Sequence, residues 1–400
     1  MLFQLIDNKQ QCPSIYMDQK IISEPEYDKL SKTWTYNCAL KDYDIEYASL
    51  YAQAQTLNEC CPDSIKDEWE QVKQKHLAYI NSFTEAKVKY NDYCFYDLVP
   101  ESFVKEYFNI KSQITDHVLK SYTKPDNYSF LLELSHLVSE IENNKLNIDI
   151  KALDKDLYHL RARNFKKKLS QINPYILYNV FGTITGRLTT KKHSFPILTL
   201  DKGYRKLIKP TNDWFIELDF NAAELRCLLA INEQRQPEED IHDWHGHILN
   251  KLSDQRMDRN DIKRKIFGWL YGPANVSLGI PQIERYYNKQ KAIKKYWNGK
   301  EIINPFGRTI KSDEFHALNA IIQSTTSDIF LRRAIAVNKM LNKRKSLTMG
   351  LIHDSMVIDF AKEDKDILED LIKVFGETDL GTFRVNATLG THFGNMKRFR

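Results

Sequence analysis

The sequence predicts an α+β fold, and three segments carry that prediction. Residues 213–220 (DWFIELDF) are rich in Trp, Phe and Ile, which predicts a strand, and they lead directly into a helical pattern, NAAELRCLLAI. Residues 346–360 (SLTMGLIHDSMVIDF) predict two apolar strands joined by a tight turn at His353, Asp354 and Ser355. Between them lies a long helical pattern, EFHALNAIIQSTTSDIFLRRAIAVNKML. Strands that alternate with long helices indicate an α+β chain.

Composition and charge indicate a folded protein with a polyanionic partner. The 400 residues are 42% hydrophobic and 12% aromatic, which excludes a disordered chain. Residues 1–150 carry 15 Lys and Arg against 24 Asp and Glu, a net charge of −9, whereas residues 151–400 carry 43 against 29, a net charge of +14. A basic C-terminal portion favours nucleic acid as the partner.

Three further observations predict a cytoplasmic protein without a membrane partner. No stretch approaches the length of a transmembrane span, and the first residues, MLFQLIDNKQ, lack the basic and apolar regions of a signal peptide. The six cysteines include no CxxC pair and no metal-ligand spacing. We therefore expect ordinary thiols in a reducing cytoplasm.

The N-terminal part is predicted to be irregular at first and then helical. Residues 1–60 contain short apolar runs broken by Asp, Asn and Pro, which predict little beyond a small α/β or irregular unit. From about residue 64, the pattern SIKDEWEQVKQKHLAYINSFTEAKVKY begins a series of amphipathic helices. The segment 161–170 (RARNFKKKLS) carries five positive charges and no negative one. It is either a solvated helix face or a strip that grips phosphates.

Two aspartates lie at the ends of the predicted strands. Asp219 closes the strand 213–220, and Asp354 lies at the turn of 346–360. Each alone is most simply a turn former or a helix cap. Together, carboxylates at the ends of apolar strands can converge on hard cations, as two Mg²⁺ ions require when they activate a hydroxyl and stabilise a leaving phosphate.

A further pattern lies in RNDIKRKIFGWLYG (259–272). Arg259, Lys263, Phe267 and Tyr271 are four residues apart, so on a helix they line one face, which we call the 259–271 stripe. Arg and Lys suit a triphosphate, and an aromatic ring one turn further on can stack on a sugar or base. The stripe therefore combines residues that suit phosphates at one end with rings that suit a sugar or base at the other.

Taken together, these segments resemble motifs A, B and C of family A (Pol I-like) DNA polymerases. The resemblance covers about residues 160–400 and is specific in combination, because the segments follow in the family's order. The matching segments are TGRLTT (185–190), DFNAAELR (219–226), DIH (240–242), RNDIKRKIFGWLYG (259–272), GR (307–308), NAIIQSTTSD (319–328) and IHDS (352–355).

The resemblance implies a right-hand polymerase fold with an antiparallel-sheet palm, helical fingers and a helical thumb. It also predicts how the chain is divided. The predicted parts are a small N-terminal segment of unknown role (1–60), a thumb-like helical region (61–180), the palm with motif A (181–235), the fingers with motif B (236–305) and the palm with motif C (306–400).

In such enzymes, Asp219 and Asp354 would hold two Mg²⁺ ions, or Mn²⁺ in their place, with the carbonyl of Phe220 as a further ligand. One ion would lower the pKa of the primer's terminal hydroxyl, and the other would neutralise the leaving pyrophosphate. Ser355 stands where motif C usually has Glu, so we expect two strong carboxylates and not a third.

The 259–271 stripe would then bind the incoming nucleotide. Arg259 and Lys263 would receive the phosphates, and Lys263 counts with the two aspartates as catalytic. Phe267 would pack on the sugar and base, and Tyr271 would lie beside the templating position. Glu224 would be the steric gate that crowds the ribose 2′ position.

Glu224 has a second interpretation that is compatible with the first. With Asn221 it has the spacing of a capping box variant, which indicates a structural role at a helix start.

The resemblance also places residues against primer–template DNA. Arg187 and Gln323 would read the minor groove, where acceptors look alike for every correct pair. A buried glutamine bonded within its helix is the alternative for Gln323. The remaining DNA-binding candidates are Arg308, Asn319, His353, Lys166, Lys167 and Lys168.

Other matches are interpreted as chance. DIE (44–46) and the YxxxD pattern of residues 93–97 have the form of exonuclease motifs but lie too close together for a nuclease fold. His242, His245 and His247 lack a fourth zinc ligand nearby, which favours a surface or packing role. The segment HSFPILTL (193–200) departs from the family, so template contacts there are not carried over.

The sequence as a whole predicts template-directed DNA synthesis from primer–template DNA and dNTPs, without intrinsic proofreading. A single-subunit RNA polymerase is the nearest rival, but Glu224 and Phe267 favour deoxynucleotides. An inactive DNA-binding replisome scaffold is the other, and it would have no need of the carboxylates and the stripe together. A compact polymerase without an exonuclease favours a phage or mobile-element replication gene, expressed in a bacterial host if it is phage-encoded, with a separate exonuclease or replisome protein as a partner.

Overall fold

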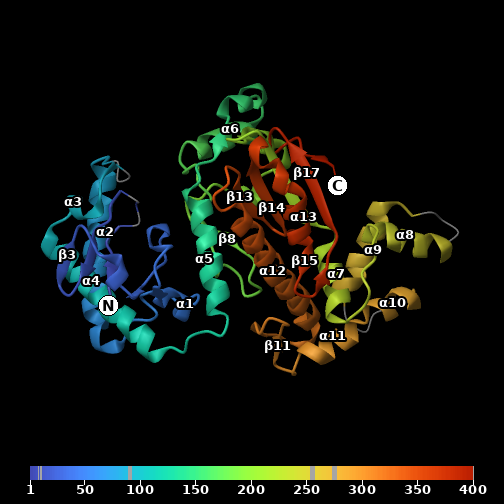
Figure 1. Cartoon of the computed structure of the whole chain (residues 1–400), viewed down its shortest axis with the longest axis horizontal. Coiled ribbons are helices and arrows are strands. Elements are labelled where there is room, and N and C mark those ends of the chain that lie inside the picture. The colour runs from blue at the N-terminus through green and yellow to red at the C-terminus, as the bar shows by residue number, and fades with distance from the viewer. Residues whose placement is uncertain (8, 10, 89–91, 253–256, 273–276, 400) are drawn as a thin grey trace. The chain divides into compact units, whose positions relative to one another are not determined.

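The chain forms two compact units in the computed structural model, Met1–Ser139 and Glu140–Arg400 (Figure 1). The structure describes all residues except 8, 10, 89–91, 253–256, 273–276 and 400. Among the described residues, no helix is both long enough and apolar enough to cross a membrane.

The first unit packs a small sheet against long helices. Its strands are β1 (Gln4–Leu5), β2 (Ile15–Met17), β3 (Lys20–Ile22), β4 (Lys32–Thr33) and β5 (Glu46–Tyr47). Its helices are α1 (Ala48–Ala52), α2 (Lys66–Glu85), α3 (Phe95–Leu98), α4 (Glu101–Ser121) and most of α5 (Tyr128–Asn143), with short 3-10 turns η1 (Tyr27–Lys29), η2 (Cys38–Leu40) and η3 (Asp63–Ile65).

The core of the first unit surrounds α4, which packs against α1 and α2 and against strands β1 and β2 of the antiparallel sheet β1–β2–β3. Val104, Ile114 and Val118 of α4 are fully buried, as their helical spacing requires. A buried hydrogen bond from the Gln4 amide to the Thr115 hydroxyl, 2.9 Å long, joins β1 to α4. Residues 1–60, for which the sequence predicts little, therefore form one core with the helices that follow them.

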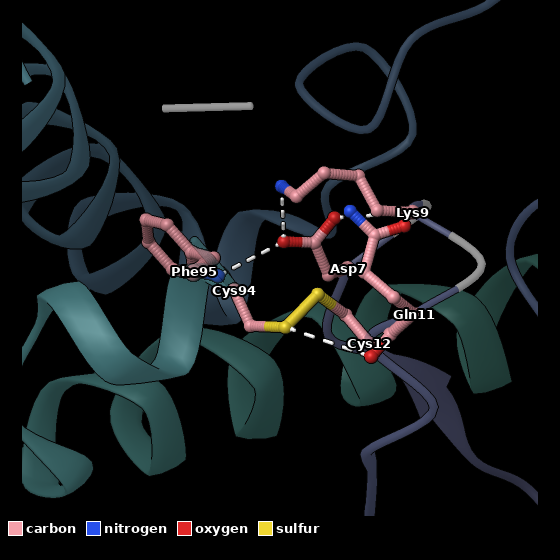
Figure 2. Close-up of a disulfide and its surroundings, with 6 residues drawn as sticks. All are labelled: Asp7, Lys9, Gln11, Cys12, Cys94 and Phe95. Atoms are coloured by element: carbon pink, nitrogen blue, oxygen red, sulfur yellow. Dashed lines mark hydrogen bonds and ion pairs between the residues drawn. A yellow bond between two sulfur atoms is a disulfide. The ribbon is translucent and has the colours of Figure 1, made fainter. Parts of the chain in front are cut away.

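A disulfide joins Cys12 to Cys94 in the first unit, so the expectation of thiols throughout is wrong for this pair (Figure 2). The two Cα atoms lie 5.6 Å apart, although 82 positions separate them in the sequence. No spacing rule signals such a pair, because the fold alone brings the loop before β2 against the start of α3. Cys60, Cys61 and Cys227 are buried thiols, as expected.

The second unit is built from the following elements. Its strands are β6 (Asn147–Ile148), β7 (Tyr178–Asn179), β8 (Thr189–Thr190), β9 (Ile208–Lys209), β10 (Trp214–Phe220), β11 (Glu301–Ile303), β12 (Thr309–Lys311), β13 (Leu347–Ile352), β14 (Ser355–Phe360), β15 (Glu377–Thr378), β16 (Gly381–Thr382), β17 (Val385–Gly390) and β18 (Lys397–Arg398). Its helices are α6 (Leu160–Leu169), α7 (Ala223–Ile231), α8 (Ile241–Leu252), α9 (Arg259–Tyr271), α10 (Pro281–Tyr287), α11 (Lys289–Tyr296), α12 (Glu314–Leu341) and α13 (Leu368–Gly376), with 3-10 turns η5 (Ile150–Asp156), η6 (Ile197–Thr199), η7 (Lys202–Leu207) and η8 (Lys362–Ile367).

A five-stranded antiparallel sheet, in the order β13–β14–β10–β17–β18, forms the centre of the second unit (Figure 1). Helices α12 and α13 pack together and against this sheet. Phe220 at the end of β10 stacks on Phe375 of α13, with ring centroids 4.5 Å apart. Because strand residues alternate between faces, Asp219 and Glu217 lie on the face opposite to Phe220 and α13.

The start of α7 differs from the predicted capping box. The residue before this helix is Ala222, in the left-handed region at φ 53°, and no side chain caps the helix. Asn221 instead donates to Asp240 at 2.7 Å and accepts from the guanidinium of Arg226 at 3.0 Å. Arg226 is fully buried and needs several acceptors, so Asn221 is committed to it rather than to the helix.

Candidate active site

Asp219 and Asp354 lie at the same end of the central sheet. In the register of β10 and β14, Asp219 pairs with Ser355, the residue directly after Asp354. Asp354 lies in the two-residue turn between β13 and β14, beside His353 at φ 54°. The convergence that the sequence predicts for the two carboxylates is therefore present in the fold.

Neither carboxylate has a strong partner. The Asp219 carboxylate accepts one long hydrogen bond, 3.5 Å from the Asn386 amide. Within the described part of the chain, no hydrogen bond or ion pair reaches the Asp354 carboxylate. The pKa of Asp219 is raised to about 7, mainly by burial and also by the negative charges of Glu217 and Asp354, although the hydrogen bond from Asn386 and the charge of Lys263 act to lower it. Burial also raises the pKa of Asp354.

These carboxylates fit a hard cation, because a bound positive charge would offset both the burial and the mutual repulsion. No group of three or more His, Cys, Asp or Glu side chains in the described ranges is arranged to hold a metal ion by itself. Two carboxylates suit Mg²⁺ nonetheless, since Mg²⁺ is usually bound by one or two carboxylates, with water and substrate phosphates completing its shell.

The 259–271 stripe is formed on α9, whose bounds match the predicted helix. The helix begins after Asp258, whose carboxylate accepts from the backbone N–H groups of residues 260 and 261 at 2.8 Å. The Lys263 ammonium lies 5.8 Å from the centre of the Phe267 ring. That ring is nearly parallel to the Tyr271 ring, at 6.0 Å and 20°. Two members of the stripe are close enough to the carboxylates for their charges to interact: Lys263 with Asp219 and Tyr271 with Asp354.

Glu224 joins the stripe to the palm through two contacts that the sequence does not reveal. Its carboxylate accepts from the Arg187 guanidinium at 2.7 Å and from the Tyr271 hydroxyl. The Glu224 side chain is only 15% exposed, so it is held in one place by both partners. Burial raises the pKa of Tyr271, and the Glu224 charge raises it further, which keeps the phenol protonated as a donor.

Arg259 is held by an acidic partner at the start of the stripe. Its guanidinium lies 2.8 Å from Asp240 and 3.7 Å from Asp243, and its side chain is 52% exposed. Burial acts to raise the pKa of Asp240, but the hydrogen bonds from Arg259 and Asn221 lower it to about 2. Asp240 is therefore a charged anchor for Arg259.

The predicted DNA-binding residues fall into two places. Arg308 forms a two-pronged ion pair with the buried Asp328, at 2.6 and 3.1 Å. Its guanidinium covers Gly186, where a Cβ would lie 2.6 Å from the nitrogen and where φ is +82°, so only glycine fits beside Arg187. Arg308 and Arg187 are thus brought together.

The two candidates on α12 lie one turn apart. Asn319 and Gln323 are both partly exposed, so the alternative of a fully buried Gln323 is not observed. The Asn319 side-chain oxygen is buried without a hydrogen-bond partner among the described residues. His353 is exposed at the hairpin turn.

The basic segment lies away from these residues. Lys166, Lys167 and Lys168 are on α6, which is well separated from α9 in Figure 1. The Lys166 ammonium pairs with Asp154 at 2.7 Å, while Lys167 and Lys168 are exposed.

The three histidines of α8 do not form a metal site. His242 and His245 are buried, and burial lowers their pKa values to about 4 and about 3. The Nε2 atom of His245 lies 3.0 Å from the Tyr287 hydroxyl. His247 is exposed and pairs with Glu239. The packing and surface roles favoured by the sequence agree with this arrangement.

Comparison with known proteins gives two matches. DNA polymerase I of Caldicellulosiruptor bescii (strain ATCC BAA-1888 / DSM 6725 / KCTC 15123 / Z-1320) is 24% identical in an alignment 241 residues long, and the match covers 48% of this chain and 28% of that protein. The solved POL domain of Pol1 from M. smegmatis, in complex with DNA primer–template and dNTP, matches with a TM-score of 0.63 at 13% identity, over 91% of this chain and 86% of that chain. No protein-family model matches the chain.

The chain therefore has an α+β right-hand polymerase fold, as its sequence predicts. More particularly, the fold is that of the polymerase domain of DNA polymerase I, and the resemblance to family A enzymes drawn from the motifs is confirmed. The chain spans under a third of the length of its curated relative, since the match covers 28% of that protein.

Proposed function

We propose that this chain is a DNA-directed DNA polymerase, which extends a primer 3′ hydroxyl with deoxynucleoside triphosphates and releases pyrophosphate. The observation that carries the proposal is the position of Asp219 and Asp354 at the same end of the central sheet, with the charge of Lys263 acting on Asp219 from α9. The M. smegmatis domain with this fold was solved with primer–template DNA and dNTP, which supports those molecules as substrates here.

Asp219, Asp354 and the carbonyl of Phe220 are the groups that would hold two Mg²⁺ ions, with Mn²⁺ as a substitute. When bound, such ions supply the charge that activates the primer hydroxyl and neutralises the departing pyrophosphate. The two carboxylates remain charged for this role because the bound cations favour their ionised form.

The stripe orients the nucleotide. Lys263 is exposed and donates to the triphosphate, and Arg259 reaches the phosphates by exchanging Asp240 for them. Phe267 packs on the sugar and base, and Tyr271 lies beside the templating position. Glu224, held from two sides, fills the space that a ribose 2′ hydroxyl would need.

The duplex is held by two groups of side chains. Arg187, Arg308, Asn319, Gln323 and His353 contact the primer end, so they position the hydroxyl that reacts. Lys166, Lys167 and Lys168 neutralise phosphates further away, which supplies affinity without sequence preference.

The proposal includes the absence of proofreading on this chain. Hydrolysis of a mispaired end needs its own carboxylate cluster. In the DIE match, Glu46 is instead occupied by the Lys124 ammonium at 2.9 Å and the Tyr51 hydroxyl at 3.1 Å. A separate exonuclease or replisome protein, docking on the acidic N-terminal part, would supply proofreading in a phage-infected bacterial cytoplasm.

Primer extension tests the proposal. The purified chain, a primed template and Mg²⁺ should give extension with dNTPs and little with ribonucleotides. Extension with ribonucleotides alone would support the RNA polymerase alternative, and DNA binding without extension would support the scaffold. With nucleotides withheld, a mismatched primer should stay intact.

A further inference from the structure

Glu217 lies beside the proposed cation site, although no motif draws attention to it. It precedes Asp219 by two residues on β10, so both side chains are on the same face of the sheet, away from α13. Its charge acts directly on Asp219. The position is in the middle of the sheet, where β10 pairs with β14 on one side and β17 on the other.

Two hydroxyls from the neighbouring strands hold the Glu217 carboxylate. The Ser355 hydroxyl of β14 donates to one oxygen at 2.9 Å, and the Thr388 hydroxyl of β17 donates to the other at 3.4 Å. Glu217 is therefore fixed at both ends of its carboxylate. Ser355, which stands where a motif C glutamate is expected, is its closer partner.

We propose that Glu217 supplies, from the neighbouring strand, the negative charge that Ser355 does not, and that it acts as a positioning residue for the cations held by Asp219 and Asp354. This inference rests on the proposed function.

The position of Glu217 beside Asp219 has an electrostatic free-energy cost that a bound cation would offset. Two carboxylates on one face of a strand repel each other, and here both are shielded from water to some degree. An alanine or serine at position 217 would avoid that repulsion. Positive charge bound at Asp219 and Asp354 would turn the repulsion into attraction. The small Ser355 side chain leaves room for Glu217 and fixes its orientation. The carboxylate expected at position 355 of β14 is thus supplied by position 217 of the paired strand β10.

The test compares four variants with the unchanged chain. Glu217→Gln keeps the shape and the hydrogen-bond acceptor but removes the charge. Glu217→Ser removes the whole carboxylate group. Adding Ser355→Glu to Glu217→Ser moves the carboxylate to the paired strand. Thr388→Val is the matched control, because it removes the longer hydrogen bond and keeps the charge.

Two readouts are needed. The first is Mn²⁺ affinity, measured by electron paramagnetic resonance on the chain with primer–template, dNTP and a primer that lacks its terminal hydroxyl, so that no turnover occurs. The second is the Mg²⁺ concentration for half-maximal extension of an ordinary primer. Glu217→Gln and Glu217→Ser should lower the Mn²⁺ affinity, and raise the Mg²⁺ concentration for half-maximal extension, by about tenfold or more. In the double variant, both quantities should return to within about threefold of those of the unchanged chain. Thr388→Val should change neither quantity by much.

Each failure has its own meaning. Unchanged Mn²⁺ affinity in Glu217→Gln, or a double variant no better than Glu217→Ser, would overturn the role of Glu217 in a chain that still extends primers. If the unchanged chain shows no Mg²⁺-dependent extension, the proposed function itself fails, and the role of Glu217 fails with it.

Discussion

In the first unit, the buried carboxylate of Asp7 accepts from the Lys9 ammonium at 2.6 Å and from the Phe95 N–H at 2.9 Å (Figure 2). In the second unit, Asp219 has one contact of 3.5 Å, and no hydrogen bond within the described residues reaches Asp354. A carboxylate that is shielded from water costs a fold more free energy when it lacks partners than when its charge is paired and hydrogen-bonded. The fold therefore satisfies Asp7 with its own residues, whereas Asp219 and Asp354 remain available for the cations that we propose.

The largest effect is expected at the second pair. Asp219→Ala or Asp354→Ala should reduce synthesis by about a thousandfold or more, because the charge that stabilises the transition state is lost. DNA affinity should change by less than about twofold, since phosphate contacts come from other residues. Primer extension and a DNA-binding titration measure the two quantities.

Matched changes in the first unit serve as the control for that prediction. Asp44→Ala and Glu46→Gln remove the acids of the DIE match and should leave synthesis unchanged. Near-normal extension by either palm variant, or loss of extension in the controls, would contradict the assignment.

The disulfide is expected to stabilise only the first unit. Cys12→Ala with Cys94→Ala should lower the free energy of unfolding of that unit by about 4 kcal/mol, because the bond closes a long loop between cysteines that are 82 positions apart. Denaturant unfolding with and without reductant measures this loss. Reductant should not change the stability of the double variant. If reductant lowered the stability of the unchanged chain and of the double variant equally, the loss would not come from this disulfide.

Asp219 should make the stability of the second unit depend on pH. Its pKa is about 7 in the folded chain against an ordinary value of 3.8, so the folded state binds more protons and its stability falls as pH rises from about 4 to about 7. Asp219→Asn should therefore raise the free energy of unfolding at pH 8 by up to about 4 kcal/mol and have little effect near pH 4.

Asp370→Asn is the control for the pH dependence, because Asp370 is an exposed aspartate of the same unit. Thermal unfolding at both pH values measures the difference between the two variants. A benefit of Asp219→Asn that does not depend on pH would remove charge burial as its cause.

The stripe offers a matched pair of lysines on α9. Lys263 lies on the stripe and Lys265 does not, yet both are exposed. Lys263→Ala should raise the dNTP concentration for half-maximal rate by about tenfold to thirtyfold, because a charged contact with the triphosphate is lost. Lys265→Ala should have an effect below about twofold. Equal effects would mean that helix charge in general, and not the stripe, binds the nucleotide.

The smallest expected effect concerns sugar selection. Glu224→Ala should raise ribonucleotide incorporation by about tenfold, measured as alkali-labile product, because the space for a 2′ hydroxyl opens. Tyr271→Phe removes one contact to Glu224 but leaves the carboxylate, so its effect should be smaller. Phe267→Tyr should instead ease acceptance of dideoxynucleotides. An unaltered sugar preference in all three would argue against a nucleotide beneath α9.

Local patterns in the second unit could be predicted from the sequence. The helix 259–271 and the strand at 213–220 were accessible because spacing and apolar content are local properties, and α9 and β10 match them closely. The approach of Asp219 to Asp354 follows from the motifs and from strand pairing.

Partners that are distant in the chain could not be predicted. The pairs Arg187–Glu224 and Arg308–Asp328 depend on how helices and loops meet in three dimensions, and so does the disulfide. The capping box failed because the demands of the buried Arg226 outweigh a local cap. The position of Glu217 could have been predicted, because the two-residue period of a strand places it on the same face as Asp219. It was missed because only the acids at the strand ends were considered.

Iron-mediated backbone cleavage tests most directly whether the cation site is formed by Asp219 and Asp354. Fe²⁺ in place of Mg²⁺, with ascorbate and peroxide, generates hydroxyl radicals that break the chain only near the bound ion. The account predicts breaks close to residues 219 and 354, suppressed by excess Mg²⁺ and absent from the Asp219→Ala chain. Breaks confined to the first unit, or breaks at 219 without breaks at 354, would contradict it.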